Sequence, residues 1–271
     1  MAHHSRIDPI ALADKRRNVL LAILALICLF VALISFFPYR TGNIPALIGL
    51  LYMVLFIACT MLSLLVLRRQ ISTGILHWTS NGMRVELIAP PVLIWAEVGT
   101  LSLLAFSSVV SMIVAMLGPR GAWMIPFGLA ILGVIGMCYL FPILRPRCGT
   151  RLRISLSNNG VALTQINGRT TIIPWQAHPR LTGVYQGYAV IAIKNHEDLR
   201  YPIGYLPLSM RQLERLLGTF SRSTRLRAKL SGPEALSTVL TVLEPTEEEL
   251  TDGSWTWDPL TAQTPNEGSP L

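Results

Sequence analysis

Residues 18–39, NVLLAILALICLFVALISFFPY, form an apolar stretch that contains no Asp, Glu, Lys, Arg or His. A bilayer core of about 30 Å requires about 20 apolar residues in a helix, and backbone amides in such a core must be bonded internally. The stretch therefore predicts a transmembrane helix. Residues 41–67, 98–119 and 121–144 are equally free of charge. We expect four transmembrane helices, arranged as two hairpins.

Basic residues indicate which ends of these stretches stay in the cytoplasm, because short loops rich in Lys and Arg remain on that side. Three basic residues occupy positions 15–17, two occupy 68–69 and four fall within 145–153, whereas each opposite turn holds one arginine. Both termini are therefore predicted to be cytoplasmic. The first stretch is interpreted as a retained anchor, because it exceeds the roughly 7–15 residues of a signal-peptide core and no A-x-A-like cleavage site follows it.

Motifs for catalysis and metal binding are missing from the sequence. The four cysteines show no C-x-x-C spacing and no histidines stand at metal-ligand spacing. Nucleotide-binding, hydrolase and zinc-protease fingerprints do not occur. We therefore expect no catalytic residue, no metal, no cofactor and no enzymatic activity. Nucleic acid is not expected as a partner, because aromatic residues for base stacking are not interleaved with the arginines.

A repeated pattern after each hairpin predicts antiparallel β structure. ILHWTSNGMRVELIAPPVLIW occupies residues 75–95, and LRISLSNNGVALTQINGRTTIIPW occupies residues 152–175. In both copies two runs flank an Asn-Gly turn, which favours a β-hairpin, and a third run ends in tryptophan. The simplest role for Trp95 and Trp175 is core packing. Charge puts both copies on one side of the membrane, and whether the first copy adds its strands to the second sheet stays open.

Further strand-like runs fall within residues 182–203, and a helix is predicted after them. Ser209 and Gln212 have the spacing of a capping box, and four apolar side chains share the following helical face: Leu213, Leu216, Leu217 and Phe220. Pro233 precedes a second amphipathic helix. The sequence thus predicts an α+β protein, in which four transmembrane helices carry an antiparallel β domain closed by a C-terminal helix.

Four short strings carry a resemblance to a known family: Asn159-Gly160, Ile173-Pro174-Trp175, Tyr201-Pro202-Ile203 and the run 213–220. On these strings the chain resembles the bacterial pleckstrin-homology-like domains that are attached to membrane hairpins. The resemblance covers residues 150–222 well and residues 71–98 weakly. It implies a pleckstrin-homology-like fold, a location in the bacterial inner membrane, and binding of lipid headgroups or proteins rather than catalysis.

Seven segments are expected. They are a cytoplasmic N-terminal segment (1–17), transmembrane hairpin 1 (18–69), a cytoplasmic β-meander (70–97), transmembrane hairpin 2 (98–145), the pleckstrin-homology-like domain (146–222), a basic segment with a helix (223–243) and an acidic tail (244–271). All 23 basic residues precede position 244, whereas seven of the 15 acidic residues fall within residues 244–271. The tail is also rich in proline and poor in apolar residues, so it is predicted to be disordered. It either solubilises the protein or docks a partner through Trp255-Thr256-Trp257.

Eight basic residues are candidate contacts for anionic lipid headgroups or for a partner protein, because juxtamembrane cations gain on the order of 1 kcal/mol each from anionic lipid. They are Arg151, Arg153, Arg169, Arg180, Arg222, Arg225, Arg227 and Lys229. The expected partners are membrane lipids and another envelope or membrane protein.

Two functions follow from different features of the sequence. The first is a membrane scaffold or accessory protein whose cytoplasmic domain binds a partner or lipid. The alternative is a small transporter or channel with its pathway between the two hairpins, although the four stretches hold no charged residue to line one. Ser107, Ser111 and Ala115 form a stripe of small residues that is expected to pack helices within the bundle. A scaffold predicts dry packing between the hairpins, and a transporter predicts polar residues around a cavity.

Overall fold

The computed structural model describes residues 9–118, 124–144, 152–165, 168–185, 187–194 and 196–259. The chain divides into two compact units. The helical unit contains Asn18–Val66 and Pro91–Cys148, and the β unit contains Met1–Arg17, Leu67–Pro90 and Gly149–Leu271. The predicted α+β class is confirmed.

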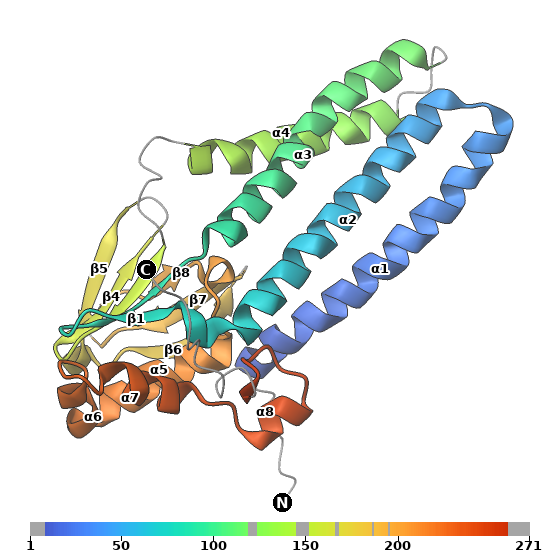
Figure 1. Cartoon of the computed structure of the whole chain (residues 1–271). Helices are drawn as coiled ribbons and strands as arrows, with labels where there is room; N and C mark the ends of the chain where they lie inside the picture. The colour runs from blue at the N-terminus through green and yellow to red at the C-terminus, as the bar shows by residue number, and fades with distance from the viewer. Residues whose placement is uncertain are drawn as a thin grey trace, which may run out of the picture. The chain divides into compact units, whose positions relative to one another are not determined.

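The long helices are α1 (Pro9–Thr41), α2 (Ile44–Ser72), α3 (Pro91–Leu117) and α4 (Met124–Leu144), and they are labelled in Figure 1. Within the described residues, these four helices are long and apolar enough to cross a membrane. The prediction of four helices of that kind is therefore confirmed. Both α1 and α2 extend beyond the uncharged stretches, because polar residues at their ends continue the helices into the β unit.

Small residues bring α3 and α4 into close contact in the helical unit. Ser107 donates a hydrogen bond to the Leu129 carbonyl at 2.8 Å, and Ser111 donates one to the Pro126 carbonyl at 2.5 Å. Gly136 faces the α3 backbone so closely that an added Cβ would lie 2.6 Å from the carbonyl carbon of Leu104. The expected packing role of the small-residue stripe thus holds at the two serines, while Ala115 is exposed.

The larger sheet has five antiparallel strands in sequence order. They are β1 (Trp78–Ser80), β2 (Val85–Ile88), β3 (Arg153–Leu156), β4 (Gly160–Thr164) and β5 (Thr170–Pro174). Strand β2 pairs with β3 along its whole length although α3 and α4 separate the two strands in the sequence. The first copy of the repeat therefore does add its strands to the second.

The smaller sheet contains β6 (Arg180–Tyr185), β7 (Tyr188–Ala192) and β8 (Leu199–Tyr201). The Tyr201 hydroxyl connects it to the larger sheet, because its proton is shared between the carbonyls of Arg153 at 3.0 Å and Thr164 at 3.2 Å. Burial raises the pKa of Tyr201, so the phenol stays protonated and remains a donor. This bond fixes β8 across from the β3 and β4 ends of the larger sheet.

Helix α5 (Met210–Arg222) closes the β unit as the sequence predicts. Ser209 accepts from the Gln212 amide and the Gln212 side chain accepts from the Ser209 amide, so the expected capping box is present. The Trp175 and Phe220 rings lie 5.9 Å apart in the core. The remaining short helices are α6 (Thr224–Lys229), α7 (Ala235–Leu243) and the 3-10 turns Gly74–His77, Trp175–Ala177 and Ile203–Tyr205.

One part of the predicted first repeat is wrong. Its third run is the beginning of α3, which starts at Pro91, because proline suits the first helical position and cannot donate in a sheet. Trp95 lies on this helix and is 72% exposed, so it is not a core residue there.

The predicted disorder of the acidic tail is wrong for residues 244–259. They contain α8 (Glu247–Thr251), and Trp255 and Trp257 are only 2% and 1% exposed. The Glu249 carboxylate lies 2.5 Å from the Arg215 guanidinium. Two buried indoles and this ion pair offset the ordering entropy that the composition alone leaves uncompensated. Residues 260–271 lie outside the described residues.

We call residues 244–259 the strap, because they bind the ends of two long helices within the β unit. The Arg17 guanidinium of α1 stacks over the Trp255 ring at 5.1 Å, and the Asp258 amide donates to the Ser72 carbonyl of α2 at 3.2 Å. The Asp14 carboxylate of α1 is buried beside the first backbone amides of α5 and lies 3.7 Å from the Arg17 guanidinium. The start of α1 and the end of α2 are therefore integral parts of the β unit.

Candidate binding trough

A cavity of about 460 Å³ opens between β5 and the segment that joins β7 to β8. We call it the trough. Its apolar lining consists of Ile172, Ile173, Pro174, Ile193 and Leu199, and its polar lining consists of Gln165, Arg169, Thr171, His196, Glu197 and Asp198. Both sheets supply walls, so the trough depends on the packing of the two sheets that Tyr201 fixes.

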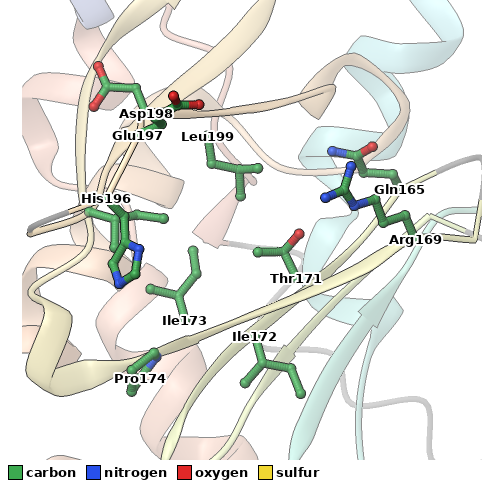
Figure 2. A pocket seen from close by; sticks show the side chains of 11 residues that line it. Gln165, Arg169, Thr171, Ile172, Ile173, Pro174, His196, Glu197, Asp198 and Leu199 are labelled. Atoms are coloured by element: carbon green, nitrogen blue, oxygen red, sulfur yellow. The ribbon is translucent and has the colours of Figure 1, made fainter.

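Charge is distributed unevenly along the trough. Figure 2 shows Arg169 and Gln165 together on one side and His196, Glu197 and Asp198 on the other. Two carboxylates therefore oppose one guanidinium across an apolar floor. A ligand with a positive group and an apolar group matches this lining better than an anion does.

The outer edge of β5 borders the trough. Two backbone hydrogen bonds show which backbone groups of β5 point toward β4. The Gln165 amide donates to the Arg169 carbonyl at 2.9 Å, and the Trp175 amide donates to the Asn159 carbonyl at 3.3 Å. By strand alternation, the backbone groups of Thr170, Ile172 and Pro174 point away from β4. Strand β5 is the last strand of its sheet in the described residues, and the Ile172 side chain is 74% exposed.

The eight predicted contact residues do not form one site. Among the seven of them that the structure describes, Arg169 is the one that lines the trough. Arg153 is half-buried in the larger sheet, where its guanidinium lies 3.3 Å from Glu86, and Glu86 also lies 2.5 Å from Arg84. Glu86 is a buried residue of β2. Arg151 lies outside the described residues.

The other five predicted contacts belong to β6, α5 and α6. Ser221 of α5 donates to the Pro179 carbonyl at 3.1 Å, which brings the end of α5 next to the start of β6. Lys229 is paired with Glu234 at 3.0 Å. Three exposed arginines remain at this corner of the β unit: Arg180, Arg222 and Arg225. A diffuse basic corner of this kind is common on a solvated surface.

Sequence reasoning missed the acidic side of the trough. His196, Glu197 and Asp198 are three consecutive ionisable residues between two strands of a basic domain. That run was a usable signal, because two adjacent acids interrupt a region in which arginine dominates. The position of Glu197 and Asp198 opposite Arg169 could not be predicted, because it follows from the packing of two sheets.

Among the described residues, no group of three or more His, Cys, Asp or Glu side chains is arranged to hold a metal ion. No protein-family model, curated protein or solved structure matches the chain. Function therefore has to be argued from the residues of this chain.

Proposed function

We propose that this chain is a multi-pass protein of the bacterial inner membrane that acts as a scaffold or accessory subunit, with both termini in the cytoplasm. Its β unit would be a pleckstrin-homology-like module that binds a partner protein. Two antiparallel sheets closed by the capped helix α5 support that fold assignment. The observation that carries the proposal is the pairing of β2 with β3, two strands that α3 and α4 separate in the sequence.

This pairing constrains the membrane topology. The shared sheet of β2 and β3 supports a topology in which the residues before α3 and after α4 lie on one side of the membrane. The Asp14 carboxylate lies beside the amides of Met210 and Arg211, so the start of α1 belongs to the same side. In the proposed topology each pair of helices crosses the membrane and returns. The basic residues at positions 15–17 and 68–69 favour the cytoplasm for the side on which the pairs begin and end.

Protein binding is better supported than headgroup binding. An anionic headgroup needs converging cations, whereas the trough sets Glu197 and Asp198 against a single arginine. Arg153 already faces the buried carboxylate of Glu86. A trough with an apolar floor and mixed charge is typical of a peptide or protein contact.

The transporter alternative receives less support from the helical unit. A cavity of about 440 Å³ lies between α2 and α4, and every residue that lines it is apolar or glycine. A pathway for a polar solute requires polar or ionisable lining. Serine and threonine side chains instead make bonds between helices, as in the 2.9 Å contact of Ser63 with Thr100.

Cysteine labelling of intact bacterial cells tests the proposed topology. The four native cysteines are replaced by alanine, and single cysteines are introduced at Met83, Asn158 or Thr41, which are all exposed. A membrane-impermeant maleimide should modify the Thr41→Cys protein in intact cells and the other two only after permeabilisation. Modification of Met83→Cys or Asn158→Cys in intact cells would overturn the topology and with it the proposed function.

A further inference from the structure

We propose that the trough binds an extended segment of a partner protein, paired with the outer edge of β5, with an apolar side chain on the floor and a Lys or Arg side chain against Glu197 and Asp198. The inference rests on the proposed function, because it names the class of partner that the β unit binds. It assigns a recognition role to residues on both sheets.

The edge of β5 supplies the backbone part of this recognition. The N–H and C=O groups of Ile172 both point outward, and a peptide strand can pair with such groups by strand addition. Pro174 has no N–H, so pairing cannot continue past it. Only a short stretch of peptide backbone can be bound in this way, and side chains must contribute most of the specificity.

The floor of the trough supplies the apolar part. Ile173 and Leu199 belong to different sheets, and the 460 Å³ between the walls accommodates an aliphatic or aromatic side chain. Side chains of an added strand alternate in direction. The peptide would therefore place every second residue into the trough and the others toward the exposed Ile172 side chain.

The acidic side supplies the charged part. Glu197 and Asp198 are exposed, adjacent in the sequence, and both line the trough, so a cation on this side is attracted by two negative charges. A phosphate in the same position would be repelled by both. The charge of the trough thus separates a basic peptide from an anionic lipid headgroup, even though the whole chain carries a net charge of +8.

The experiment uses the full-length chain in lipid nanodiscs and a displayed library of random heptapeptides. Enriched peptides should alternate apolar residues and carry Lys or Arg at one fixed position. Replacing that cation with Glu in a dye-labelled peptide should weaken binding about tenfold or more by fluorescence anisotropy, as expected for a charge-assisted contact. Inorganic phosphate and anionic phosphatidylglycerol vesicles should not compete.

Two variants identify the site. Glu197→Lys/Asp198→Lys should shift the enriched peptides toward acidic residues, and because both positions are exposed, the fold should be retained. Glu247→Lys/Glu248→Lys makes the same charge change on exposed residues of α8 and should leave the enriched sequences unchanged. Lack of any consensus, a consensus unaffected by the trough variant, or competition by phosphate or vesicles would overturn the inference. If cysteine labelling gives the expected pattern but the peptide experiments do not, the proposed peptide binding is wrong and the proposed topology is retained.

Discussion

Replacement of Gly136 with valine should separate α3 from α4 and strongly destabilise the helical unit. The new Cβ would lie 2.6 Å from the Leu104 carbonyl carbon and closer still to the Ala105 amide nitrogen. Both are backbone atoms of a neighbouring helix, so no rotamer change can relieve the contact. Overpacking in a dense core costs about 1–3 kcal/mol and occasionally more, and a clash with backbone belongs at the upper end of that range.

Gly128→Val is the matched control for this variant. Gly128 lies on the same helix, and a Cβ there meets nothing within 4 Å. Both substitutions introduce the same β-branched residue, so any common effect on helix propensity cancels. We expect the thermal unfolding midpoint in mild detergent to fall strongly for Gly136→Val and little for Gly128→Val. Equal midpoints for the two variants would show that α3 and α4 do not pack through Gly136.

The double variant Trp255→Ala/Trp257→Ala should release the strap. Removing a buried tryptophan side chain costs about 3–5 kcal/mol, and both indoles are almost completely buried in the β unit. Loss of Trp255 also removes the ring beneath the Arg17 guanidinium. We therefore expect the strap to detach and the start of α1 to loosen from the β unit.

Limited proteolysis measures this effect at residues 244–259. The wild-type strap should resist cleavage, and the double variant should be cut there rapidly. Trp95→Ala provides the control, because it removes an indole that is largely exposed and should leave the strap protected. Rapid cleavage of the wild-type strap would mean that the disorder predicted from composition is correct.

The helices, most strands and the closing helix could be predicted from local patterns. Uncharged length marks α1 to α4, Asn-Gly turns mark hairpins, and the spacing of Ser209 and Gln212 marks the start of α5. These features depend on residues that lie close together in the sequence, so they can be recognised from a single sequence.

The errors arose where tertiary contacts outweigh local composition. Trp255 lies beneath Arg17 of α1, Trp257 lies close to Gly74 in the turn after α2, and Glu249 pairs with Arg215 of α5. Nothing within the tail reveals these partners. The run before Trp95 has strand-like residues, yet Pro91 begins a helix there. Glu197 and Asp198 were visible as residues, but their place opposite Arg169 depends on how two sheets pack.

A cross-strand disulfide tests most directly whether segments on either side of α3 and α4 form one sheet. Ile88 is the Cα partner of Arg153, and Arg153 is the Cα partner of Thr164 on the next strand. The amide of Ala89 donates to the Leu152 carbonyl, so Ile88 and Arg153 form a non-hydrogen-bonded pair with Cα atoms about 4.5 Å apart. That separation suits a disulfide.

In a chain without its native cysteines, Ile88→Cys/Arg153→Cys should oxidise almost completely, whereas Ile88→Cys/Thr164→Cys should not, because its two strands lie about 9–10 Å apart. The disulfide is measured as protection of the two cysteines from a bulky maleimide, which is lost when the disulfide is reduced. Strong protection of the first pair alone is the result that the shared sheet predicts. Equal, weak protection of both pairs would contradict it.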